Sequence, residues 1–256
     1  MPDGMNLRAT HNPRQLPERM ADRLIVALDV PTVEEASAIV ASLEGAVAFF
    51  KIGLWLQFAK GVDGLISSIV ESGNQLFLDA KMYDVPETVS RAVASAVQRR
   101  ASFITIHGDE NIMRAAVKAK EGSDLKVFAI TVLTSLDDAA LKRMGYALKA
   151  KDLVQLRARM AVDCHCDGII ASADDDPDQI RMLAGNKKLL IATPGIRPAG
   201  SAPDDQKRIA TPREAIANGA DYLVVGRPIV AAPDRRAAAL AIIREMELGD
   251  ADRGDA

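Results

Sequence analysis

The sequence has only two cysteines among its 256 residues, and aromatic residues make up just 4% of it. Cys164 and Cys166 lie too close together for a framework of disulfides, so we expect a reducing, cytoplasmic environment. The shortage of aromatic rings, with a net charge of −3, argues against a surface that binds nucleic acid or anionic membranes. No run of about 18 apolar residues is present, so we expect no transmembrane helix.

The two ends of the sequence differ from the part between them. Residues 1–21 are polar, are interrupted by prolines and lack the apolar core of a signal peptide. We expect a disordered extension over 1–21, a disordered, solvated tail over 249–256, and chemistry in neither. No Gly/Ser-rich linker or shift in composition divides residues 22–248, which predicts one catalytic domain.

Eight short, nearly continuous apolar runs alternate with amphipathic helical segments along this domain. Such runs are typical of parallel strands that are covered on both faces. A capping box begins at Thr32, and Pro86 stands where a first helical turn would begin. Eight alternating repeats favour a single closed (β/α)8 TIM barrel over an open sheet. The predicted strands are residues 24–29, 46–52, 75–79, 103–107, 127–133, 168–172, 189–193 and 222–226.

Charged residues gather at the C-terminal ends of the first three predicted strands, where enzymes of this fold carry their active sites. Asp29, Lys51, Asp79 and Lys81 occupy these positions. On an extended chain Asp79 and Lys81 project to the same face, about 6–7 Å apart, and Lys51 can approach from the neighbouring strand. Alternating charges offset one another's desolvation and keep each other ionised. An active site is therefore predicted at this end, with a structural ion-pair network as the alternative.

Glycine and arginine follow the seventh and eighth predicted strands, as Gly195 with Arg197 and Gly226 with Arg227. Barrels commonly build phosphate sites in these two loops, from backbone N–H groups and the fork of a guanidinium. Residues 198–211 lack helical periodicity and are expected to form a mobile lid over the phosphate. A surface loop without a role is the alternative. The substrate class predicted is a small phosphorylated molecule.

Together these residues resemble the orotidine 5′-phosphate decarboxylase family in its bacterial form, over roughly residues 23–229. The combination of Asp-x-Lys-x-x-Asp with Thr-Pro-Gly-Ile-Arg-Pro is specific to that family, although related barrels share the first motif. The matching segments are Leu28-Asp29, Phe50-Lys51-Ile52-Gly53, Asp79-x-Lys81-x-x-Asp84-Val85-Pro86-x-Thr88, Leu133-Thr134-Ser135, Thr193-Pro194-Gly195-Ile196-Arg197-Pro198, Gln206 and Gly226-Arg227-Pro228.

The resemblance implies decarboxylation of orotidine 5′-phosphate to UMP and CO2 in pyrimidine biosynthesis, with no cofactor and no metal. It implies that Lys81 donates a proton to C6 of the pyrimidine, that Asp79 lies beside the substrate carboxylate, and that Lys51 orders Asp79 and the ribose. Asp84 and Thr88 are implied to complete the site of the neighbouring subunit, in a homodimer.

The resemblance also implies how the rest of the substrate is held. Asp29 would bind the ribose hydroxyls, Thr134 or Ser135 the edge of the pyrimidine, and the phosphate would lie among Gln206, Arg227 and the Gly226 amide. The family commonly has Asn before Thr88, where this sequence has Glu87. An acidic residue suits the beginning of a helix, so we expect no loss of function.

Two other functions remain open at this point. A Mg-dependent sugar-phosphate decarboxylase or aldolase of the same barrel group needs an acidic ligand where this sequence has Lys51, whose ammonium would repel the metal ion. A non-catalytic phosphate-binding barrel does not need the complete charged set. Formation of UMP from orotidine 5′-phosphate would separate both from the decarboxylase.

Overall fold

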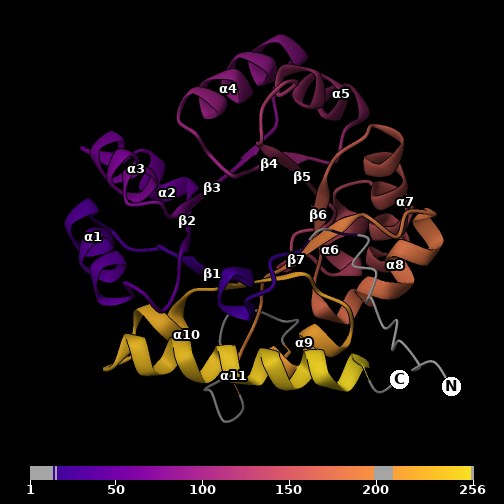
Figure 1. The fold of residues 1–256 in the computed structure, drawn as a ribbon. Coiled ribbons are helices and arrows are strands. Elements are labelled where there is room, and N and C mark those ends of the chain that lie inside the picture. The colour runs from indigo at the N-terminus through magenta and orange to yellow at the C-terminus, as the bar shows by residue number, and fades with distance from the viewer. Residues whose placement is uncertain (1–13, 15, 199–209, 255–256) are drawn as a thin grey trace, which may run out of the picture.

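A computed structural model describes residues 14, 16–198 and 210–254 of the chain (Figure 1). Eight parallel strands close into one barrel in chain order, and β1 pairs with both β2 and β8. The predicted (β/α)8 fold is confirmed. The strands are β1 (Leu24–Ala27), β2 (Phe49–Gly53), β3 (Gln75–Met82), β4 (Phe103–His107), β5 (Lys126–Ile130), β6 (Gly168–Ile170), β7 (Leu190–Thr193) and β8 (Tyr222–Val225).

Helices surround the barrel and connect successive strands (Figure 1). The hydroxyl of Thr32 caps α1 by accepting a hydrogen bond from Glu35 N at 3.1 Å, and Pro86 begins α4 as expected. The α-helices are α1 (Val33–Ser42), α2 (Leu54–Gln57), α3 (Val62–Glu71), α4 (Pro86–Gln98), α5 (Glu110–Ala119), α6 (Asp138–Arg143), α7 (Ala150–Asp163), α8 (Pro177–Ala184), α9 (Pro212–Ala217), α10 (Arg227–Val230) and α11 (Arg235–Gly254). Within the described part of the chain, no helix has both the length and the apolar character that crossing a membrane requires.

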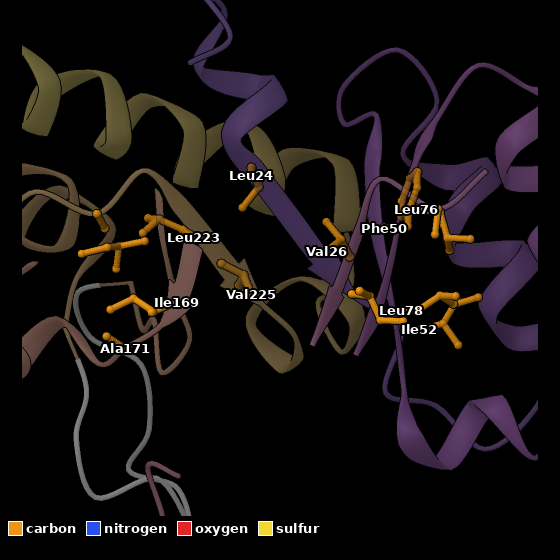
Figure 2. Close-up of a cluster of buried hydrophobic side chains, with 14 of the residues drawn as sticks. Leu24, Val26, Phe50, Ile52, Leu76, Leu78, Ile169, Ala171, Leu223 and Val225 are labelled. Carbon is orange, nitrogen blue, oxygen red and sulfur yellow. The ribbon is translucent and has the colours of Figure 1, made fainter. Parts of the chain in front are cut away.

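Alternation along each strand divides the core into two layers. One set of side chains packs between strands and helices, including Leu24, Val26, Phe50, Ile52, Leu76 and Leu78 (Figure 2). The other set fills the barrel with aromatic rings. The ring centre of Phe103 lies 4.5 Å from that of Phe128, 4.8 Å from Phe49 and 5.1 Å from Tyr222. Because these rings fill the interior, the inside of the barrel has no room for a substrate.

Part of the expected N-terminal extension packs on the barrel. Arg14 Nε lies 2.8 Å from Oδ1 of Asp221, which is fully buried just before β8. Leu16 packs against the interior layer, and Met20 is buried at the start of the 3-10 helix η1 (Met20–Arg23). The prediction of disorder is therefore wrong for residues 14 and 16–21, because a buried carboxylate gains a counter-charge there and apolar side chains are covered. Residues 1–13 and 15 lie outside the described residues.

The C-terminal residues also depart from expectation, because α11 continues to Gly254. Gly249 is packed so closely that a Cβ there would lie 2.3 Å from the carbonyl oxygen of Arg213. Beyond it, Asp252 forms an ion pair with Arg213 at 2.7 Å, and Arg253 forms one with Asp178 at 2.8 Å. The predicted tail over 249–256 is wrong for 249–254, since these contacts hold the last helical turns against the barrel. Residues 255–256 lie outside the described residues.

Candidate active site

A cavity of about 430 Å³ opens at the C-terminal ends of the strands. Most of the candidate residues predicted from the sequence lie around this cavity. Those that line it are Asp29, Lys51, Asp79, Lys81, Thr134, Arg197, Gly226 and Arg227. Apolar side chains from the ends of β5, β6 and β8 form the remaining wall, among them Ile130, Val132, Ile170 and Val224.

Asp79 is the centre of the charged side of this cavity. Its Oδ2 lies 2.6 Å from Lys81 Nζ and 3.2 Å from Lys51 Nζ, and its Oδ1 accepts a hydrogen bond of 2.8 Å from the Thr105 hydroxyl. Lys51 Nζ also lies 3.1 Å from Asp29 Oδ1. The side chains of Lys51 and Asp79 are nearly buried, whereas the Lys81 side chain is 37% exposed. The ammonium of Lys51 is thus held inside the cluster, and that of Lys81 faces the cavity.

The backbone at Lys81 departs from the regular extended geometry expected of it. The pairing register of β3 with β4 shifts between Leu78 and Met82, and Lys81 has a φ of 47°. A left-handed conformation is uncommon for a residue other than glycine. It is held by a 3.0 Å hydrogen bond from Lys81 N to Thr105 Oγ1, so the Thr105 hydroxyl fixes both Lys81 and Asp79. The shift, and not simple alternation, turns the Lys81 side chain into the cavity.

Burial and charge act in opposite directions on the two inner groups. Burial alone would raise the pKa of Asp79, but the ammonium groups of Lys51 and Lys81 and two hydrogen bonds outweigh it and lower that pKa. Burial would likewise lower the pKa of Lys51, but the carboxylates of Asp79 and Asp29 outweigh it and raise that pKa. The Asp79 contribution to stability is therefore lost only as pH falls through its lowered pKa, and that of Lys51 only as pH rises through its raised pKa. Both groups stay ionised at neutral pH.

Gly53 leaves the space in which the Asp29 and Lys51 side chains meet. A Cβ at this position would lie 2.4 Å from Asp29 Oδ1 and 3.2 Å from Lys51 Nζ. The φ of Gly53 is −75°, which any residue can adopt, so only the side-chain contact opposes a substitution. Sequence reasoning listed Gly53 as part of a motif without a role, because this contact depends on the folded arrangement of two strands.

We expect Gly53→Ala to fold normally and to lower kcat/KM roughly 10- to 100-fold, because the methyl group displaces Asp29 from Lys51 by about 1 Å. Gly64→Ala is the matched control, since a Cβ at Gly64 meets nothing within 4 Å. The measurement is steady-state kinetics of both variants, with thermal melting to verify the fold. Wild-type kcat/KM for Gly53→Ala would show that the Asp29–Lys51 contact has no part in the site.

Several candidate residues lie elsewhere. Ser135 is exposed and does not line the cavity, whereas Thr134 beside it does. Asp84 and Thr88 are exposed and also lie outside the cavity lining of their own chain. Gln206 lies outside the described residues, as do residues 199–209 of the expected lid.

Sequence reasoning missed Thr105, Ser172 and the apolar wall of the cavity. Thr105 is fully buried, and its signal was a hydroxyl between the two isoleucines of strand β4. Ser172 lines the cavity after β6, at a strand end whose residues carried no charge. The apolar lining residues could not be told from core residues by pattern alone, because β5, β6 and β8 carry the same aliphatic residue types at their ends as in their interiors.

The amino-acid sequence of the chain is similar to those of a known protein family. The model of the Orotidine 5'-phosphate decarboxylase / HUMPS family matches residues 22–242 of the chain. The chain is 49% identical over 232 residues to the orotidine 5′-phosphate decarboxylase of Afipia carboxidovorans. These aligned residues make up 91% of this chain and 97% of that protein. It is 47% identical over 234 residues to the enzyme of that name from Nitrobacter winogradskyi, covering 91% of this chain and 95% of that one.

A solved structure gives the same result for the fold. The crystal structure of orotidine 5′-phosphate decarboxylase from Lactobacillus acidophilus superimposes with a TM-score of 0.77 at 31% sequence identity. The superposition covers 88% of this chain and 99% of that one. The match to the family model, over residues 22–242, includes all eight strands, and the structural similarity covers most of the chain.

Proposed function

Because this chain belongs to the Orotidine 5'-phosphate decarboxylase / HUMPS family, we propose that its strand-end cavity converts orotidine 5′-phosphate to UMP and CO2, with Lys81 as the proton donor. The reaction is a step of pyrimidine biosynthesis. The observation that carries the assignment is the Asp79 carboxylate held between two ammonium groups, at 2.6 Å from Lys81 and 3.2 Å from Lys51.

The chemistry explains why such a cluster is needed. When the bond between C6 and the carboxyl group breaks, CO2 leaves and the electron pair stays on C6, in the plane of the ring and without an adjacent electron sink. A pre-positioned ammonium at Lys81 stabilises this carbanion and then transfers a proton to C6. Each 1.36 kcal/mol of stabilisation at the transition state gives about a tenfold increase in rate.

Asp79 and Lys51 act on the same step through charge and orientation. The Asp79 carboxylate lies beside the substrate carboxylate, and their repulsion is relieved as CO2 departs. Lys51 and Thr105 keep Asp79 ionised and fixed in place, so the repulsion is not avoided by protonation or rotation. The apolar wall of Ile130, Val132 and Ile170 surrounds the ring and limits the water that would weaken these interactions.

The remaining lining residues bind the parts of the substrate that are distant from C6. Asp29 binds the ribose hydroxyls, and Thr134 binds the edge of the pyrimidine. Arg227, Arg197 and the Gly226 amide bind the phosphate. Binding energy from the phosphate assists the distant reaction at C6 when it holds the ring in place against Lys81.

The same cluster disfavours the metal-dependent alternative within this family. A Mg²⁺ site would use the carboxylates at the strand ends as ligands. In this chain Lys51 Nζ lies within 3.2 Å of both Asp29 and Asp79, so an ammonium already occupies the position between them. A non-catalytic phosphate-binding barrel gives no account of this buried arrangement of charges.

We further propose a homodimer in which Asp84 and Thr88 enter the cavity of the partner subunit. Both are exposed outside the cavity of their own chain. On and next to α2, which contacts β3, and on either side of Asp84 in the chain, large apolar side chains face solvent to an extent that is unusual for a monomer. They are Leu54 (51% exposed), Trp55 (61%), Phe58 (85%), Tyr83 (71%) and Val85 (63%). A two-fold axis through this patch would cover it and exchange the two Asp84 side chains.

Two free thiols, Cys164 and Cys166, are buried in the structure. Free cysteines are typical of reducing compartments. We therefore propose the cytoplasm as the place where this reaction occurs.

The direct test of the reaction is a turnover assay with purified protein and orotidine 5′-phosphate, before and after treatment with EDTA. We expect stoichiometric UMP and CO2 at an undiminished rate, because Lys51 stands where a metal ligand would be needed. Loss of activity with EDTA, restored by Mg²⁺, would instead support the metal-dependent alternative.

A further inference from the structure

Arg157 on α7 forms hydrogen bonds with Thr131 and Tyr146, which lie at the two ends of a long segment that leaves the barrel after β5. Its Nη1 donates a hydrogen bond to the carbonyl of Thr131, directly after β5. Its Nη2 donates one of 3.0 Å to the hydroxyl of Tyr146, and Cζ lies 5.5 Å from the centre of the Tyr146 ring. Tyr146 lies between α6 and α7, so one guanidinium holds both ends of residues 131–146.

This excursion, hereafter the β5 loop (residues 131–146), forms part of the active-site cavity. Val132, Leu133 and Thr134 line the cavity immediately after the point that Arg157 holds. Thr131 itself is fully buried, and its hydroxyl donates to Ile170 O at 2.8 Å. The beginning of the β5 loop is thus fixed on one side by β6 and on the other by Arg157.

The neighbouring strand end leaves space for the Arg157 side chain. A Cβ at Gly108, directly after β4, would lie 2.8 Å from Arg157 Cδ and 2.8 Å from the carbonyl oxygen of Ile130. Burial, followed by the charges of Arg157 and Lys81, lowers the pKa of His107. His107 is therefore neutral at physiological pH and adds no further cation beside the guanidinium.

We propose that Arg157 is a positioning residue for pyrimidine recognition: by holding both ends of the β5 loop, it fixes Thr134 at the edge of the ring. The inference rests on the proposed function, in which Thr134 contacts the pyrimidine. A guanidinium can donate to two acceptors and stack on a ring at the same time, whereas the ammonium of lysine lacks this planar fork. The role therefore requires arginine and not only a positive charge.

A double-mutant cycle of Arg157→Met and Thr134→Val tests the inference, with calorimetric Kd values for UMP and for ribose 5-phosphate. We expect each single variant to weaken UMP binding about tenfold, as for the loss of a buried hydrogen bond. Ribose 5-phosphate, which has no pyrimidine, should bind as it does to the wild type. In the Thr134→Val background, Arg157→Met should add less than about a twofold loss, because both changes remove the same contact. Arg157→Lys should resemble Arg157→Met.

The outcomes separate this inference from the function on which it rests. If Thr134→Val leaves UMP binding unchanged, the proposed contact of Thr134 is wrong and the role of Arg157 fails with it. If Thr134→Val weakens UMP binding but Arg157→Met does not, or if Arg157→Met weakens the binding of both ligands equally, the positioning role alone is overturned.

Should Arg157→Met not fold, Tyr146→Phe removes the hydrogen bond between Arg157 and the Tyr146 hydroxyl while keeping the ring. It should then weaken UMP and not ribose 5-phosphate, and equal binding of UMP to Tyr146→Phe and wild type would overturn the inference.

Discussion

Lys81→Ala is expected to lower kcat by roughly four decades or more while leaving the fold intact, because the variant loses the ammonium that we propose as the proton donor and as the charge that stabilises the carbanion. The Lys81 side chain is 37% exposed, so its removal opens no buried cavity. Alanine has the same backbone cost as lysine at a φ of 47°, and Asp79 keeps Lys51 and Thr105 as partners. The measurement is kcat at saturating substrate, with a thermal melt of the variant.

Lys187→Ala is the control for this substitution, since Lys187 is exposed in the turn before β7, at the opposite end of the barrel. It should keep wild-type kcat. If Lys81→Ala retained more than about a tenth of wild-type kcat, less than 1.4 kcal/mol of barrier would depend on this ammonium. Another group would then have to be the donor.

Mixing two inactive variants, Lys81→Ala and Asp84→Ala, should restore activity when subunits exchange. Lys81 lies in the cavity of its own chain, and Asp84 is proposed to complete the cavity of the partner. In a mixed dimer one site carries both substitutions and the other carries neither. Random mixing of equal amounts makes about half of the dimers mixed, so the expected activity is about a quarter of wild type per subunit, by two-fold symmetry.

The control for complementation is Lys81→Ala mixed with itself after labelling, which measures exchange without creating an intact site. Kinetic recovery should follow the time course of that exchange. Activity that stays at the level of the single variants, while labelled subunits demonstrably exchange, would show that Asp84 acts within its own chain or not at all. The shared site would then be abandoned, although the assignment of Lys81 would stand.

Much of the fold could be predicted, because parallel strands covered on both faces have a distinctive composition. The runs at 75–79 and 103–107 fall within or on β3 and β4 as observed. The ends of the chain could not be predicted in the same way. Arg14 and residues 249–254 look like solvated segments in sequence, and only their contacts with Asp221 and with the backbone of Arg213 hold them on the barrel.

The same distinction applies to the active site. That Lys51, Asp79 and Lys81 lie together at one cavity could be predicted, because the C-terminal ends of successive parallel strands meet at the same end of a barrel. Thr105 and Arg157 could not, because the partners of their hydrogen bonds, Asp79 for Thr105 and Thr131 and Tyr146 for Arg157, come within reach only in the folded chain. The bulge that turns Lys81 into the cavity also lay beyond prediction, since it depends on how β3 pairs with β4.

A crystal structure with UMP bound would test the central claim most directly, because it places every atom of the product relative to the cluster. We predict that UMP occupies the strand-end cavity with C6 within about 3 Å of Lys81 Nζ, close enough for proton transfer. Its phosphate should lie at Arg227, and Asp84 of the partner subunit should border the same cavity. UMP bound outside this cavity, or bound within it with C6 turned away from Lys81, would contradict the account.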